Sequence, residues 1–179
     1  LTLSNSLLRP EHLTDPDCNA LCRLFQEQND PQNGAIVHAE LLTQYLKKNY
    51  PSLYLVSSTT KVLTDFNDLQ RELARPEFRY VVPDFRLNRA FDQLAALPQS
   101  QKDKVEFLCN ECCWFGCTER RACYEPSAAK IWVCQARSIT AAPPVQPGGY
   151  RFSRAMANPG FIGIQAIRDT YLPMGFTQF

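Results

Sequence analysis

The sequence lacks long apolar runs and any excess of one charge sign. No run approaches eighteen apolar residues, which a membrane-spanning helix requires, and no charged-then-apolar leader opens the chain. The formal net charge is +1, and basic residues occur only in short pairs such as Lys47-Lys48 and Arg120-Arg121. These absences predict a soluble, cytoplasmic protein that binds neither membranes nor nucleic acid.

Three well-marked catalytic signatures are also missing. The chain has no glycine-rich phosphate loop, no nucleophile elbow around a serine, and no His-Glu-x-x-His helix. The sequence therefore does not point to a P-loop nucleotide-binding protein, an α/β-hydrolase or a zinc peptidase of the common type.

What the chain does contain is an alternation of short apolar segments with amphipathic ones. The apolar segments end near Asn5, His38, Ser58, Asp84 and Asn110, and helical patterns lie between them. Strands joined by helical crossovers pair in parallel. The 179 residues predict a single α/β domain over 1–179 with five parallel strands, and a sixth begins at 176–179. A closed eight-stranded barrel needs about 200–250 residues, so we expect a partial (β/α) barrel.

The predicted part-barrel has two open edges. Leu1 and Phe179 both fall inside expected strands, which indicates a barrel clipped at both ends. Because bare sheet edges invite pairing, we expect a homo-oligomer that covers them.

Polar residues follow the apolar strands, and parallel pairing brings them to one rim. We take four as candidate catalytic residues. His38 is either a catalytic group or a hydrogen-bonded packing residue. Asp84 beside Arg86 is either a general acid/base with a partner for a substrate anion, or a structural ion pair. Glu111 either meets a metal-bound water or faces solvent. A small-molecule ligand would bind at this rim, which is formed by Asn5, His38, Ser57, Ser58, Thr59, Lys61, Asp84, Arg86, Asn110 and Glu111.

A Cys-rich and Pro/Gly-rich insertion spans 109–150 and holds six of the eight cysteines. Cys113, Cys117 and Cys123 follow a C-x3-C-x5-C spacing, and Cys134 or Cys109 supplies a fourth thiolate. Four thiolates suit an iron–sulfur cluster or zinc. Free thiols and disulfides are the alternatives. The neighbouring pair Arg120-Arg121 is expected to favour thiolate.

A helix is predicted after Thr14, which we expect to cap it ahead of Pro16. Cys18 and Cys22 fall on its apolar stripe and are expected to be small core residues.

Five segments resemble an uncharacterised family of bacterial and archaeal barrel proteins. They are LSNS (3–6), LVSSTTKVLTD (55–65), YVVPDFRLN (80–88), NECCWFGC (110–117) and TYLPMGF (170–176). The family is distantly similar to collagenase-like peptidase and ubiquinone-hydroxylation barrel proteins, some of which hold an iron–sulfur cluster. The resemblance implies a barrel fold with more chain before the first strand and after the last.

Two functions are compatible with these patterns. The first is a part-barrel binding or assembly module whose cysteines hold a metal, or form a thiol cluster, at the strand carboxyl-terminal rim. The alternative is a barrel enzyme, redox or hydrolytic, with an iron–sulfur or zinc site.

Overall fold

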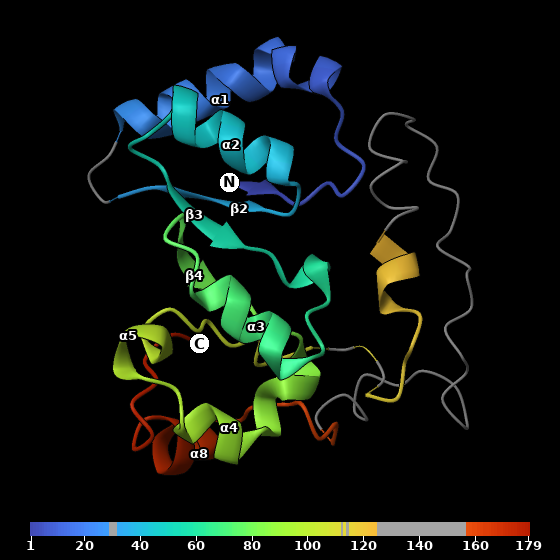
Figure 1. The fold of residues 1–179 in the computed structure, drawn as a ribbon, viewed down its shortest axis with the longest axis vertical. Helices are drawn as coiled ribbons and strands as arrows, with labels where there is room; N and C mark the ends of the chain where they lie inside the picture. The colour runs from blue at the N-terminus through green and yellow to red at the C-terminus, as the bar shows by residue number, and fades with distance from the viewer. Residues whose placement is uncertain (29–31, 112, 114, 125–156) are drawn as a thin grey trace.

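The computed structural model of the chain describes residues 1–28, 32–111, 113, 115–124 and 157–179. Its centre is a parallel sheet with the strand order β1-β2-β3-β4 (Figure 1). The sheet is open and does not close into a barrel. Most of the predicted insertion, together with Cys112, Trp114 and Cys134, lies outside the described residues. The strands are β1 (Thr2–Leu3), β2 (Gly34–Val37), β3 (Tyr54–Ser57) and β4 (Phe78–Val81).

Helices connect the strands, as the alternating pattern predicts. The α-helices are α1 (Pro16–Glu27), α2 (Glu40–Asn49), α3 (Phe66–Leu73), α4 (Phe91–Ala95), α5 (Gln99–Lys102) and α8 (Ile164–Ala166). The 3₁₀ turns are η1 (Pro10–Thr14), η2 (Thr59–Lys61) and η3 (Phe85–Arg89), and η4 (Ile167–Tyr171) is a π-helical segment.

The expected fifth and sixth strands are not formed as strands in the described residues. Single parallel bridges join Val81 to Val105 and Glu106 to Gln178. Pairing stops there because the next carbonyl groups have other partners. The Leu108 carbonyl accepts from the side chain of Asn88, and the Cys109 carbonyl accepts from the backbone of Ile162.

Side-chain capping fixes where several helices begin. Asp65 accepts from the backbone N–H groups of Asn67 and Asp68 and so caps α3. Helix α1 is capped by Asp15, whose carboxylate accepts from the Cys18 N–H. The prediction that Thr14 caps this helix is therefore wrong: Thr14 ends the preceding η1 turn.

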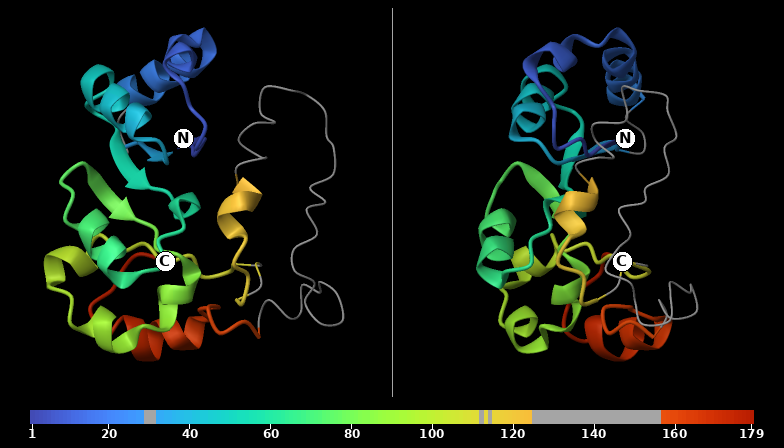
Figure 2. Two further views of the ribbon diagram at one scale, coloured as in Figure 1. Left: turned by 45° about the vertical axis from the view of Figure 1, so that its right-hand side comes forward. Right: turned by 90° about the vertical axis from the view of Figure 1, so that its right-hand side faces the viewer.

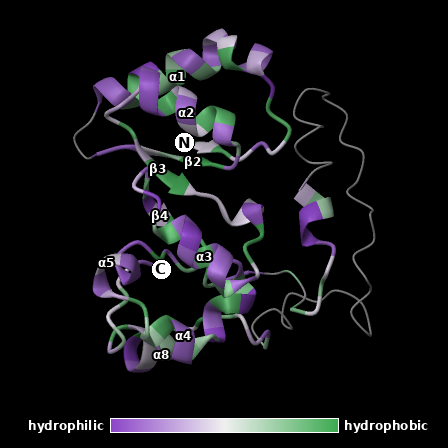
Figure 3. Ribbon diagram, in the orientation of Figure 1, coloured by the Kyte–Doolittle hydropathy of each residue, from purple (hydrophilic) through white to green (hydrophobic). Residues whose placement is uncertain are grey.

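The hydrophobic core lies between the sheet and its covering helices. Leu69, Val81, Leu94 and Val105 are fully buried, and apolar residues follow the strands and the inner helix faces (Figure 3). Helix α1 is less deeply buried than its stripe predicts. Cys22 is buried, but Cys18 is exposed, which contradicts its expected place in the core.

Aromatic packing holds the C-terminal segment against 105–109. The ring of Phe107 lies 4.9 Å from that of Tyr171 and 5.0 Å from that of Phe176, within the range of favourable edge-to-face contacts. The Tyr171 hydroxyl also donates to the Asn88 carbonyl over 2.6 Å. Within the described residues, no helix has the length and apolar character needed to cross a membrane.

Candidate functional site

A cleft lies at the carboxyl ends of β2 and β3. Its volume is about 430 Å³. One wall comes from the residues that follow the two strands, and the other comes from the helical residues 120–124 (Figure 1; Figure 2, left-hand view). None of the described residues that line it is acidic. We call it the rim cleft, and its lining is Ser6, Leu7, His38, Thr60, Lys61, Leu63, Arg121 and Tyr124.

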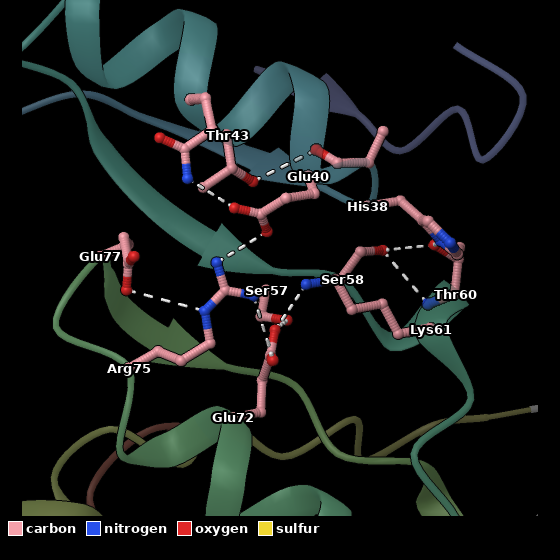
Figure 4. Close-up of polar contacts among 12 residues, drawn as sticks. His38, Glu40, Thr43, Ser57, Ser58, Thr60, Lys61, Glu72, Arg75 and Glu77 are labelled. Carbon is pink, nitrogen blue, oxygen red and sulfur yellow. Dashed lines mark hydrogen bonds and ion pairs between the residues drawn. The ribbon is translucent and has the colours of Figure 1, made fainter.

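His38 follows β2 and points into a group of hydroxyls. Its Nδ1 lies 2.8 Å from Thr60 Oγ1, which in turn donates to Ser58 Oγ over 3.0 Å (Figure 4). Burial lowers the pKa of His38, and the positive charges of Lys61 and Arg121 lower it further. The imidazole is therefore neutral at pH 7 and can serve as a hydrogen-bond donor or acceptor.

The ammonium group of Lys61 is anchored beneath the cleft by Glu72 of α3. The two groups are 2.5 Å apart and both side chains are mostly buried. Glu72 also accepts from the Ser57 hydroxyl over 2.6 Å (Figure 4). The next residue, Val62, has φ 54, a left-handed conformation that costs a β-branched residue about 1–3 kcal/mol. Such strain next to a cleft is typical of functional positions.

Glu72 belongs to a larger set of charges that Arg75 completes. Arg75 lies 2.8 Å from a Glu40 oxygen, 3.5 Å from Glu72 and 3.6 Å from Glu77 (Figure 4). Burial alone would raise the pKa of Glu72, but hydrogen bonds from Lys61 and Ser57 outweigh it, so this pKa is lowered. Glu72 is therefore ionised at neutral pH and offsets much of the Lys61 charge.

A buried ion triad joins the cysteine-rich segment to the end of the sheet. Arg120 is 2% exposed. Its Nε lies 3.4 Å from Asp84 Oδ2, and its Nη2 lies 2.5 Å from Glu111 Oε2. The guanidinium also stacks on Phe85, 4.8 Å from the ring centroid. Asp84, which is fully buried, caps η3 through the Arg86 N–H and pairs with the Arg86 side chain at 3.3 Å.

Glu111 connects this triad to two of the predicted metal ligands. Its second oxygen accepts from the Cys113 N–H over 2.8 Å, and the Cys113 thiol hydrogen bonds to Cys117. Burial and the neighbouring Cys117 raise the pKa of Cys113 to about 11, although Arg120 acts in the opposite direction. Arg120 therefore favours the thiolate of Cys113, as the sequence predicts, but burial is the larger effect.

The candidate residues thus divide into two places. Asp84, Arg86 and Glu111 meet around Arg120, whereas His38 stands in the rim cleft. The six described cysteines are free: Cys18, Cys22, Cys109, Cys113, Cys117 and Cys123. Among the described residues, no group of three or more His, Cys, Asp or Glu side chains is placed to hold a metal ion. Because Cys134 lies outside them, the ligand set Cys113, Cys117, Cys123 and Cys134 stays a prediction.

Sequence reasoning missed Glu72 and the central position of Arg120. Glu72 lies one helical turn after Leu69 on α3, so the two side chains share a face of the helix. This spacing could have placed Glu72 near the sheet. Nothing local distinguishes Arg120 from Arg121, since the two are adjacent and chemically identical.

Fold and site together define an α/β protein with a polar cleft at the carboxyl-terminal rim of a parallel sheet. No protein-family model matches the chain, and neither the curated proteins nor the solved structures contain a significant match. The resemblance to the barrel family therefore stays a prediction.

Proposed function

We propose that the chain is a binding module that takes a small anionic molecule, such as a carboxylate or phosphate, in the rim cleft. The observation that carries this proposal is the lining itself. It combines the cations Lys61 and Arg121 with the hydroxyls of Thr60, Ser6 and Tyr124, and the described lining contains no carboxylate. Anions are favoured where cations and hydroxyl donors converge. Because Glu72 offsets much of the Lys61 charge, Arg121 supplies most of the positive charge.

Arg121 is the main contact expected for the anion. It is exposed, and one of its N–H groups donates to the Lys61 carbonyl over 3.2 Å. A guanidinium has five N–H donors, so others remain to bind an oxyanion. The hydroxyls of Ser6 and Tyr124, which also line the cleft, would then orient the ligand by hydrogen bonds.

The strand order supports the part-barrel interpretation. The four strands pair in sequence order, so every crossover moves in the same direction along the sheet. Because such crossovers are right-handed, they place the connecting helices on one face of the sheet. That is the arrangement of a (β/α) barrel, in which ligands bind at the carboxyl-terminal rim. We propose that 105–109 and 176–179 continue this partial barrel, and that a homo-oligomer covers its edges.

We also propose that the Cys113–Cys117 pair belongs to a soft-metal site, either zinc or an iron–sulfur cluster, completed by Cys123 and Cys134. The thiol–thiol contact supports this site. Metal analysis of anaerobically purified protein, with its visible spectrum, tests it: a metal-free protein that keeps its full thermal stability would contradict the proposal.

Isothermal titration calorimetry tests the anion proposal. Inorganic phosphate and acetate are the probes, and glycerol is the uncharged control. We expect the anions to bind and glycerol not to bind. Arg121→Gln should weaken anion binding by about ten-fold, the equivalent of one charge-assisted hydrogen bond. Arg23→Gln, which removes an exposed charge from α1, should leave it unchanged. Equal binding by both variants would contradict the proposal.

An enzyme is the second candidate, favoured by the neutral His38 imidazole beside hydroxyl groups. A base of this kind, in hydrogen-bond contact with Thr60, can accept a proton from a bound substrate or water. The test is hydrolysis of a panel of carboxylate and phosphate esters. Activity that is lost in His38→Gln but kept in His12→Gln would favour the enzyme over the binding module.

A further inference from the structure

A second cavity lies between β1, η1, α1 and α2, and it shares no lining residue with the rim cleft. Its volume is about 190 Å³. Unlike the rim cleft, it is lined mainly by apolar side chains: Leu3, Leu8, Leu13, Leu42, Leu46 and the thiol of Cys22.

A polar group in this wall, the Asn19 amide, is already saturated. Its two N–H groups donate to the carbonyls of Leu13, over 2.8 Å, and of Asp15, over 2.7 Å. Its oxygen accepts from the hydroxyls of Tyr45, over 2.7 Å, and of Tyr50, over 2.6 Å. A side-chain amide has two donors and two acceptor sites. Asn19 therefore has no hydrogen bond left for a ligand.

Asp15 places a negative charge at the cavity, whose lining also includes His12. It lines the cavity, and its carboxylate caps α1 by accepting from the Cys18 N–H over 2.8 Å. This hydrogen bond lowers the pKa of Asp15, so the group is ionised at neutral pH. A bound anion would be repelled by it. A carboxylate or phosphate, the ligand proposed for the rim cleft, would therefore not bind here.

We propose that this cavity is a binding site for a compact, neutral, apolar molecule about the size of one aromatic ring. The size follows from the volume, since drug-sized ligands occupy about 300–1,000 Å³ and an apolar cavity of about 150 Å³ holds benzene. The apolar character follows from the leucine walls and the saturated amide. The Cys22 thiol adds a polarisable contact for an aromatic ring.

Cys18 marks the mouth of the cavity. It lines the cavity, yet it is exposed to solvent. A large side chain at this position can therefore fill the opening without disturbing the buried core. Ala20 offers a matched control, because it is an exposed residue of the same helix and does not line the cavity.

The experiment uses benzene and indole as neutral probes, with benzoate as the anionic counterpart. Thermal unfolding and the methyl NMR signals of the leucines are followed during titration. We expect the neutral probes to raise the melting temperature, because a ligand that binds the folded state stabilises it. They should also shift the signals of Leu13, Leu42 and Leu46, and benzoate should do neither.

Two variants locate the site. Cys18→Trp should weaken benzene binding by roughly ten-fold or more, because the indole occupies the space, whereas Ala20→Trp should bind like the wild type. The proposal is overturned if the wild type shows no response to the neutral probes, or if both variants bind equally.

Discussion

At the scale of single residues, Glu72 controls the charge beneath the rim cleft. It accepts hydrogen bonds from Lys61 and Ser57 and lies 3.5 Å from the Arg75 guanidinium. The side chain is 12% exposed, so these partners, in place of water, supply the hydrogen bonds and positive charge that stabilise its carboxylate. The position of the Lys61 ammonium depends on the same carboxylate.

This burial predicts an acid-sensitive contribution to stability. The pKa of Glu72 in the folded state is below its ordinary value of 4.5. Its contribution is therefore fully present above pH 4.5 and is lost as the pH falls through the folded-state pKa, because the unfolded chain then binds more protons. Urea unfolding between pH about 6 and about 3 should show stability falling towards acid, less steeply in Glu72→Gln. Exposed Glu27→Gln is the control and should keep the wild-type slope; an unchanged slope in Glu72→Gln would contradict the prediction.

At the scale of elements, a buried guanidinium is a main attachment of the segment that runs from Glu111 to Tyr124. Arg120 contacts Asp84, which follows β4, and Glu111, which begins the segment. Asn158 adds a second attachment by donating to the Cys113 carbonyl over 2.7 Å. The wall of the rim cleft that carries Arg121 and Tyr124 is therefore positioned by ion pairs more than by regular secondary structure.

Removing the guanidinium should destabilise the protein strongly. Arg120→Met leaves Asp84 buried without this partner, and a broken buried ion pair costs about 3–5 kcal/mol. Arg121→Met, on the exposed side, should change the free energy of unfolding by less than about 0.5 kcal/mol. Urea unfolding measures both.

A double variant separates lost charge pairing from lost packing. Asp84→Asn added to Arg120→Met should recover part of the stability, since a neutral amide costs less to bury than an unpaired carboxylate. If the double variant loses as much as the sum of the two single ones, the ion pair is not the cause.

At the scale of the whole molecule, β1 lies at the edge of the sheet that the described strands form. The Leu1 carbonyl accepts from the Ile36 N–H, so in a parallel ladder the N–H and carbonyl of Thr2 point away from β2. These outward groups are available for pairing with another chain.

Removing the outward N–H of Thr2 tests the proposed homo-oligomer. Thr2→Pro removes the outward N–H and should shift the sedimentation equilibrium towards monomer, because proline blocks edge pairing. Thr2→Val keeps the N–H and should behave like the wild type. An unchanged association constant in Thr2→Pro would mean that another surface forms the contact.

The parallel α/β fold, and the gathering of polar residues such as His38 and Lys61 at strand carboxyl ends, were predictable from sequence. Both depend on local patterns, such as the apolar segment before His38 and the proline and acid that follow β4. The hydrogen-bond partners of individual polar side chains were not predictable, because they depend on the path of a loop. Asn88, for example, is a residue type that often caps helices and stands shortly before α4. Its amide instead donates to the carbonyls of Leu108 and Gly160, and α4 begins after Ala90. For the same reason, the sequence did not predict that strand pairing at 105–109 is limited to single bridges.

Arg120 and Arg121 are neighbours in one helical turn, and adjacent helical residues face different directions. Arg120 therefore enters the protein interior while Arg121 reaches the rim cleft. Their roles depend on the number of residues that separate them from Glu111. A one-residue deletion in this stretch would bring Arg121 to the interior position and Ala122 to the cleft, and a one-residue insertion would bring Glu119 to the interior position. Evolution and engineering should therefore tolerate changes of residue type between Glu111 and Arg120 far better than changes of length.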